Sequence, residues 1–209
     1  MDLARFPIDS AGFDGPVLVT GAGGCIGSWT LALLTHAGVP AVAFDLSDDR
    51  RRPRLLMTEE ELVKVPWVTG DIADTEAVTA AVAQHDIRAI IHLAALQVPF
   101  CKADPVAGAK VNVVGTVNVF EAARGCRLKR LAYASSIAAH SFFPEAPWLA
   151  TLYGAYKLCD EMIARTYAGD WDVPSVGIRP GVVYGVGRDQ GLTSKTTVAI
   201  LAAAAGRPY

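Results

Sequence analysis

A tyrosine and a lysine stand four residues apart in the segment Tyr153-Gly154-Ala155-Tyr156-Lys157. On a helix this spacing places Tyr153 and Lys157 on one face, one turn apart. A free phenol ionises near pH 10, so its use as a base at neutral pH requires roughly 4 kcal/mol of selective phenolate stabilisation. A neighbouring ammonium and the charge of an oxidised nicotinamide can supply this in a dry cleft. The pair alone is common on helix surfaces and needs supporting residues.

A serine at the end of an upstream strand is the first supporting residue. The run Tyr133-Ala134-Ser135-Ser136 ends an apolar segment, and hydroxyls at the carboxyl end of a parallel strand face the crevice where ligands bind. Ser136 can therefore donate a hydrogen bond to a substrate oxygen whose charge changes. The structural alternative is a serine that only caps a turn. Together with Tyr153 and Lys157, Ser136 favours proton-transfer chemistry.

A glycine-rich turn, Thr20–Gly27, separates the first apolar run from the first predicted helix. Such a turn lets backbone approach a pyrophosphate, and the helix N-terminus offers free N–H groups and partial positive charge. Asp45 ends the second strand, at the distance expected for an acid that binds the adenosine ribose hydroxyls. A carboxylate there would repel a 2′-phosphate, which favours NAD over NADP. The arginines from Arg50 onward argue for NADP, although we expect the charged segment Asp48–Arg54 to be a solvated loop or helix edge.

These residues must be positioned by alternating strands and helices. Short runs that are apolar throughout, as expected for strands buried on both faces, are Pro16–Thr20, Val39–Asp45, Val65–Gly70, Ala89–Leu93, Arg130–Ser135 and Val173–Ile178. The predicted helices are Ile26–Ala37, Thr75–Gln84, Pro105–Arg124 and Tyr153–Ala168, with Gly38, Gly125 and Gly169 as the stops of the first, third and fourth. This alternation predicts a Rossmann-type doubly wound α/β fold with a parallel sheet.

Composition excludes several classes of protein. The chain has 209 residues, of which 52% are hydrophobic and 19% charged, so it is long enough for a folded domain. A net charge of −2 argues against a nucleic-acid partner. No apolar run approaches the roughly 20 residues that cross a bilayer, and the first residues do not read as a secretory signal. Four cysteines without a C-x-x-C pair suggest reduced thiols. We expect a cytoplasmic protein with a small-molecule substrate and no membrane association.

In this order, the glycine turn, Asp45, Ser136, Tyr153 and Lys157 resemble the extended short-chain dehydrogenase/reductases, in the NAD-dependent epimerase/dehydratase branch. Further motifs that resemble this branch are Gly70–Ile72, His92–Ala95, Asn112–Thr116 and Arg179–Gly185. The resemblance implies NAD as the cofactor. It implies contacts to NAD from Gly21, Gly24, Cys25, Ile26, Gly27, Asp45, Asp71, Ile72, Leu93, Ala94, Ala95, Asn112, Tyr153, Lys157, Pro180, Val182 and Val183.

The resemblance also implies roles for the catalytic residues. Tyr153 acts as general base toward a substrate hydroxyl, or as acid in the reverse direction. Lys157 stabilises the phenolate and holds the nicotinamide ribose, Ser136 orients the reacting oxygen, and the cofactor takes the hydride. By the same likeness His92 is structural, no metal is expected, and a homodimer forms through the helices Pro105–Arg124 and Tyr153–Ala168.

Departures from the family pattern narrow the substrate. Val182 stands where nucleotide-sugar epimerases often have an asparagine that contacts substrate, and Ala139–Ser141 replaces a V-Y-G triplet. The segment Ser136–Ala138 lacks the Thr-Asp-Glu triplet of the dehydratases, which argues against sugar 4,6-dehydration. We therefore expect an NAD-dependent dehydrogenase or epimerase for a secondary hydroxyl of a smaller hydroxylated or sugar-like substrate. The alternatives are a nucleotide-sugar epimerase with tightly bound NAD and a non-catalytic NAD-binding sensor or scaffold.

The length of the chain is the last departure. Residues 1–190 are expected to form the NAD-binding domain that carries the serine, tyrosine and lysine. Residues 191–209 are expected to begin a substrate-binding lobe that is largely absent from this chain, because proteins of this family normally continue well beyond such a point.

Overall fold

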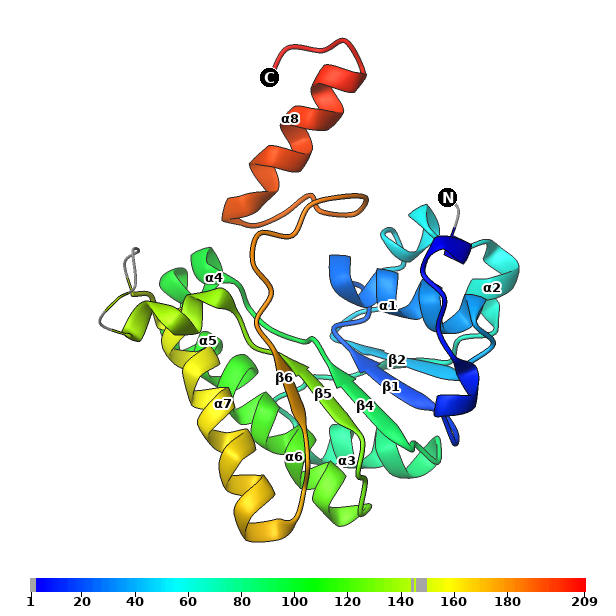
Figure 1. Cartoon of the computed structure of the whole chain (residues 1–209), viewed down its shortest axis with the longest axis vertical. Helices are drawn as coiled ribbons and strands as arrows, with labels where there is room; N and C mark the ends of the chain where they lie inside the picture. Colours follow the sequence, from blue (N-terminus) through cyan, green and yellow to red (C-terminus); the bar gives the residue numbers. More distant parts are fainter. Residues whose placement is uncertain (1–2, 144, 146–149) are drawn as a thin grey trace.

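The protein is a six-stranded parallel sheet with helices on both faces (Figure 1). A computed structural model describes residues 3–143, 145 and 150–209. The strands run in the order β3-β2-β1-β4-β5-β6, and every neighbouring pair is parallel. Their bounds are β1 (Val17–Thr20), β2 (Ala41–Asp45), β3 (Trp67–Thr69), β4 (Ala89–His92), β5 (Leu131–Ala134) and β6 (Val176–Ile178). The predicted doubly wound α/β fold is confirmed, and each strand lies within its predicted run.

Eight α-helices connect and flank the strands in the described residues. They are α1 (Cys25–His36), α2 (Glu59–Val63), α3 (Thr75–Gln84), α4 (Val98–Ala103), α5 (Pro105–Ala109), α6 (Gly115–Gly125), α7 (Leu152–Trp171) and α8 (Lys195–Ala204). A π-helical turn, Lys110–Val114, joins α5 to α6. Short 3-10 helices lie at Leu3–Arg5, Ser10–Gly12, Pro53–Leu55, Ile137–Phe142 and Leu192–Ser194. None of the helices in this described part is long and apolar enough to span a membrane.

The sheet has an apolar core on each face because alternate strand residues point to opposite sides. Leu18 packs in the core under α3, α6 and α7, with Phe120 and Tyr167 supplied by these helices. Val17 and Val19 point the other way, into a second core beneath α1 and α2. All four residues of β1 are therefore buried, and its carboxyl end is fixed at the centre of the sheet, where the strand order reverses between β1 and β4. Ligands bind at such a switch point in open α/β sheets.

The edge strand β6 differs from the prediction that every strand is buried on both faces. Val176 and Ile178 are 63% and 58% exposed, because β6 pairs only with β5 and no helix covers its outer face in the described residues. The helix α8 projects away from the sheet beyond the carboxyl ends of the strands (Figure 1).

Two predicted helix stops are wrong. The helix α7 passes through Gly169 and ends at Trp171, where Asp172 takes the left-handed conformation (φ 53°, ψ 42°) and donates its N–H to the Tyr167 carbonyl. Asp is among the few non-glycine residues that adopt this conformation readily. The helix α6 includes Gly125 and leaves the positive φ to Arg127. Gly38, with φ 73°, follows α1 as predicted.

Candidate functional site

The glycine turn between β1 and α1 is shaped by close backbone contacts. Gly21 has φ 68°, and a Cβ at this position would lie 2.7 Å from the Ala94 nitrogen. A Cβ on Gly27 would collide with the Gly21 carbonyl oxygen. Gly24 precedes α1 as an N-cap without a side chain, so no side-chain oxygen caps the first N–H groups of the helix. This cradle suits a pyrophosphate group.

The carboxylate of Asp45 lies beside this turn, at the end of β2. Its Oδ2 accepts a hydrogen bond from the Gly23 N–H at 2.8 Å, and its Oδ1 accepts one from the Leu46 N–H at 2.8 Å. Asp71 follows β3, and its Oδ1 accepts a hydrogen bond from the Ala73 N–H at 2.9 Å. Both carboxylates are thus held by backbone donors at the carboxyl end of the sheet, where the sequence predicted contacts to adenosine.

Ser136 and Tyr153 are brought together by the start of α7. Ser136 follows β5 and caps the 3-10 helix Ile137–Phe142, because its Oγ accepts the Ala138 N–H at 3.1 Å. Accepting this bond uses a lone pair and leaves the hydroxyl proton for donation. Gly154 lets α7 approach closely, since a Cβ there would lie 2.5 Å from the Ala138 carbonyl oxygen. Tyr153, in the first turn of α7, therefore lies at the same end of the sheet as Ser136.

Lys157 lies one turn further along α7 and is 2% exposed. Its Nζ donates to Asp160 Oδ2 at 3.0 Å, and Asp160 is completely buried. Burial raises the pKa of Asp160, while the Lys157 ammonium and the nearby Thr116 hydroxyl oppose the rise. The Thr116 hydroxyl donates to the Asn112 carbonyl oxygen at 2.7 Å, which leaves Asp160 Oδ1 without a hydrogen bond among the described residues. No motif in the sequence pointed to this buried acid.

His92 takes part in a buried chain of hydrogen bonds. The N–H groups of Leu93 and Ala94 both donate to Thr20 Oγ1, so the Thr20 proton is directed to His92 Nδ1 at 2.7 Å. The His92 Nε2–H then donates to Thr116 Oγ1 at 3.2 Å. Burial, followed by the charge of Lys157, lowers the pKa of His92 to about 3. A neutral, fully engaged imidazole agrees with the expected structural role of this residue.

Asn112 has a supporting position instead of the predicted cofactor contact. It is completely buried, and its side chain accepts the Leu96 N–H at 2.7 Å and donates to the Leu96 carbonyl oxygen at 2.9 Å. Asn112 therefore fixes the backbone of the bend after β4 at Leu96, and it does not line the cavity at the end of the sheet. The resemblance of the Asn112–Thr116 motif to the family could not show whether the Asn112 side chain faces the cavity or the backbone of this bend.

One cavity of about 660 Å³ joins these features at the carboxyl ends of the strands. This volume lies within the range of small-molecule sites. With the exception of Asn112, every residue that the sequence assigned to the site lines it: Gly21, Gly24, Cys25, Ile26, Gly27, Asp45, Asp71, Ile72, Leu93, Ala94, Ala95, Ser136, Tyr153, Lys157, Pro180, Val182 and Val183. The cavity thus brings the glycine turn and the serine, tyrosine and lysine into one space.

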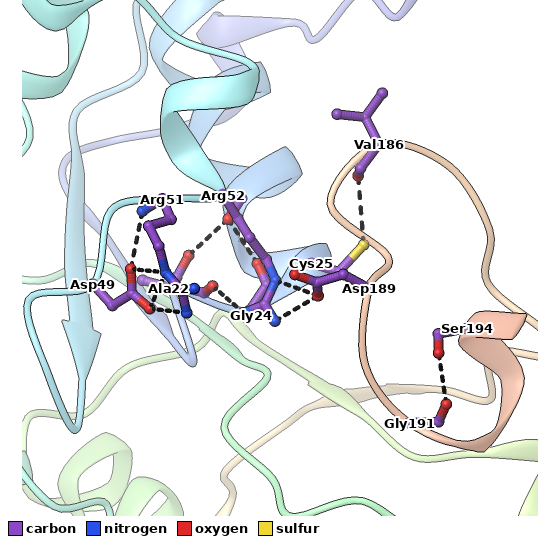
Figure 2. A network of polar contacts seen from close by, with 12 residues as sticks. Ala22, Gly24, Cys25, Asp49, Arg51, Arg52, Val186, Asp189, Gly191 and Ser194 are labelled. Carbon is purple, nitrogen blue, oxygen red and sulfur yellow. Dashed lines mark hydrogen bonds and ion pairs between the residues drawn. The ribbon is translucent and has the colours of Figure 1, made fainter. Parts of the chain in front are cut away.

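The loop after β6 continues along one side of the cavity, and no sequence motif pointed to its later part, Val186–Asp189. Figure 2 shows the Val186 carbonyl facing the Cys25 thiol, and Asp189 paired with Arg52. The Arg52 guanidinium donates to Asp189 Oδ1 at 2.6 and 2.9 Å and to the Gly23 carbonyl oxygen at 3.0 Å. Arg52 therefore belongs to the site, and the prediction that the segment Asp48–Arg54 is only a solvated loop or helix edge is wrong for this residue.

Comparison with known proteins places the chain in a family. A sequence model of the NAD dependent epimerase/dehydratase family matches residues 17–208. The chain belongs to this family. Among curated relatives, the UDP-glucose 4-epimerase of Mycolicibacterium smegmatis is 34% identical over 182 residues, which cover 82% of this chain and 57% of that protein. An uncharacterized 37.6 kDa protein of Escherichia coli O111:H- is 32% identical over 197 residues, covering 88% and 59%.

Solved structures of the family have the same fold. The UDP-glucose 4-epimerase of Thermus thermophilus, in complex with NAD, superposes with a TM-score of 0.75 at 25% identity and covers 93% of this chain and 64% of its own. The holo form of the L-threonine dehydrogenase from Cupriavidus necator gives a TM-score of 0.78 at 25% identity, with 93% and 64% covered. The chain therefore spans less than two thirds of the length of each of these relatives.

Proposed function

We propose that this chain carries the dinucleotide site and the proton-transfer residues of an NAD-dependent oxidoreductase. Its substrate is a small hydroxylated or sugar-like molecule that reacts at a secondary hydroxyl. The observation that carries the proposal is the shared cavity, which Ser136, Tyr153 and Lys157 line together with the glycine turn and Asp45. Membership of the NAD dependent epimerase/dehydratase family supports the class of enzyme.

The residues present fit a dinucleotide, because Gly21 and Gly27 let the turn pack tightly on the residues after β4 and on α1, and no side chain caps the N-terminus of α1 beside the cavity. Asp45 would bind the adenosine ribose hydroxyls, and Asp71 would meet the adenine. Ile72, Leu93, Ala94, Ala95, Pro180, Val182 and Val183 would line the rest of the site. When bound, NAD supplies a hydride acceptor for the substrate carbon.

The protein's own residues orient the substrate hydroxyl and accept its proton. The Tyr153 phenolate removes the proton from the substrate hydroxyl, and the Lys157 ammonium favours the phenolate over the phenol. The Ser136 hydroxyl donates a hydrogen bond to the reacting oxygen. Because Ser136 is already fixed by the Ala138 N–H, its Oγ needs little reorganisation during the reaction.

The experiment that tests this function is a spectrophotometric screen for NAD reduction with sugars, sugar acids, hydroxy amino acids and alcohols. We expect turnover with at least one class and a loss of about 100-fold or more in Tyr153→Phe, which removes the proton acceptor. Tyr156→Phe is the matched control on the same helix, because its hydroxyl donates to the Pro105 carbonyl oxygen and takes no part in the proposed chemistry. Equal losses in both variants would contradict the assignment of Tyr153.

A nucleotide-sugar epimerase is the second candidate, favoured by relatives that are named UDP-glucose 4-epimerase. Such an enzyme would retain NAD through purification and convert a UDP-sugar without net NAD reduction. Val182 lines the cavity and its side chain offers no hydrogen bond to a sugar, which favours the dehydrogenase. Incubation with UDP-glucose, followed by chromatography of the product, separates the two reactions.

The choice of NAD over NADP follows from Asp45. Its carboxylate is held beside the glycine turn by two backbone N–H groups, so it cannot turn away from a 2′-phosphate without breaking them. Of the nearby arginines, Arg51 and Arg52 are paired with Asp49 and Asp189. We expect calorimetry to give a Kd for NAD at least about tenfold lower than for NADP. Equal affinities would contradict this assignment.

A homodimer is part of the proposal. Val106 on α5 and Leu152 and Met162 on α7 are 65%, 46% and 49% exposed, and apolar side chains of this size favour a covered face. Light scattering should give twice the chain mass, and Met162→Lys should reduce it to the monomer mass. A monomeric parent protein at micromolar concentration would contradict the dimer.

A further inference from the structure

The cationic side chains around the cavity differ in whether they have an acidic partner. Arg51 pairs with Asp49 at 2.8 Å and Arg52 with Asp189 at 2.6 Å. Lys157 pairs with Asp160 at 3.0 Å. Each of these three cations therefore already has a carboxylate partner within the protein.

Arg188 is different. It lines the same cavity, yet it forms no ion pair with any carboxylate of the described residues. Its Nη2 donates to Thr193 Oγ1 at 2.8 Å, while its Nε is buried without a hydrogen-bond partner in the described part of the chain. A buried guanidinium N–H that lacks an acceptor is unfavourable, so such a group indicates a ligand that supplies one.

The position of Arg188 is set by contacts on both sides of it. The Val186 carbonyl oxygen accepts the Trp29 indole N–H at 3.0 Å and lies 3.7 Å from the Cys25 sulfur. Asp189 is fixed to Arg52, which is itself bonded to the Gly23 carbonyl oxygen (Figure 2). The loop that carries Arg188 is thus tied at two points to the glycine turn and the first turns of α1.

The charge of Arg188 acts on the N-terminal end of α1. Burial raises the pKa of the Cys25 thiol, and the charge of Arg188 is the largest of the effects that oppose this rise. Cys25 is the first residue of α1, where the N–H groups of the helix and its partial positive charge also favour an anion. The guanidinium and the helix N-terminus therefore act on the same region of the cavity.

We infer that Arg188 is a binding residue for the pyrophosphate of the dinucleotide. This inference rests on the proposed NAD function. The planar guanidinium matches two phosphate oxygens, and such charge-assisted pairs are among the stronger hydrogen bonds in proteins. When the side chain turns toward the ligand, a phosphate oxygen accepts the Nε–H, and the loop from Val186 to Asp189 covers the bound phosphates.

The test compares Arg188→Gln with the parent protein by calorimetry, using ADP-ribose and adenosine as ligands. ADP-ribose carries the pyrophosphate and lacks the nicotinamide, whereas adenosine carries neither. We expect Arg188→Gln to weaken ADP-ribose binding by about 10- to 100-fold and to leave adenosine binding unchanged. Arg188→Lys keeps the charge but lacks the planar guanidinium, so its affinity for ADP-ribose should lie between those of the parent protein and Arg188→Gln. Arg207→Gln, at an exposed position, should bind ADP-ribose as the parent protein does.

Unchanged ADP-ribose binding in Arg188→Gln, or an equal loss for adenosine, would overturn the inference. If the variant does not fold, phenylglyoxal modification of the parent protein decides the question. Inorganic pyrophosphate should protect Arg188, measured by mass spectrometry, at least about fivefold more than Arg207. Equal modification with and without pyrophosphate overturns the inference. A parent protein that binds pyrophosphate but not NAD would instead contradict the proposed function and leave Arg188 as an anion-binding residue.

Discussion

Removing one partner of the ion pair between Lys157 and Asp160 should be strongly destabilising, and the effect can be measured without knowing the substrate. The two side chains are 3% and 0% exposed, with 3.0 Å between Nζ and Oδ2. Removing one partner of such a pair leaves the other charge buried and unpaired, which costs about 3–5 kcal/mol. Asp160→Asn should therefore lower the free energy of unfolding by this amount, because the Lys157 ammonium loses its counter-charge.

The assay is thermal unfolding followed by circular dichroism at pH 7. For a domain of this size, each kcal/mol corresponds to about 2–4 °C in Tm, so we expect a decrease of roughly 6–20 °C. The matched control is Asp172→Asn, which removes the partner of Lys129 from a pair whose carboxylate is 91% exposed. An exposed pair contributes about 1 kcal/mol or less.

A double variant separates loss of the pair from loss of packing. Lys157→Met combined with Asp160→Leu replaces both charges by apolar groups and should recover most of the stability lost in either single variant. A Tm for Asp160→Asn within about 3 °C of the parent protein would refute the reasoning. So would a double variant as unstable as the sum of the two single variants.

Two further predictions concern the same end of the sheet. Gly154→Ala should destabilise by about 1–3 kcal/mol in urea unfolding, because its Cβ would meet the Ala138 carbonyl oxygen at 2.5 Å. Gly169→Ala, in open space on the same helix, should instead stabilise by about 0.5–1 kcal/mol, and the opposite order would contradict the packing described. The hydrogen bonds from Arg179 lower the pKa of Glu161, so this stabilisation is present above the ordinary value of 4.5 and is lost as pH falls through the folded-state value. Arg179→Gln should therefore be less stable than the parent protein at pH 7, with a difference that shrinks below about pH 4, and a constant difference in urea titrations across this range would contradict the pairing.

The strands of the sheet could be predicted closely because each one is marked by residues that are consecutive in the sequence. Each strand is a short apolar run, and β1 follows the pattern so well that all four of its residues are buried. The exposure of Val176 and Ile178 could not be predicted in the same way, since an apolar run does not reveal whether a strand has a neighbour on both sides. The end of α7 was missed because Asp172 takes the left-handed conformation that the prediction assigned to Gly169.

The site was predictable where residues follow a strand directly. Asp45 and Ser136 lie where their strands end, so their positions follow from the topology of a parallel sheet. Arg52 and Arg188 reach the cavity from loops, and only the folded arrangement of those loops brings them to the glycine turn. Asp160 lies on α7 at a position where the sequence alone does not indicate complete burial.

A crystal structure of the chain grown with NAD tests the central claim most directly. We expect the adenosine at Asp45, the pyrophosphate at the N-terminus of α1, and the nicotinamide within contact distance of Tyr153 and Lys157. A dinucleotide bound elsewhere, or a nicotinamide directed away from Tyr153, would contradict the proposed site.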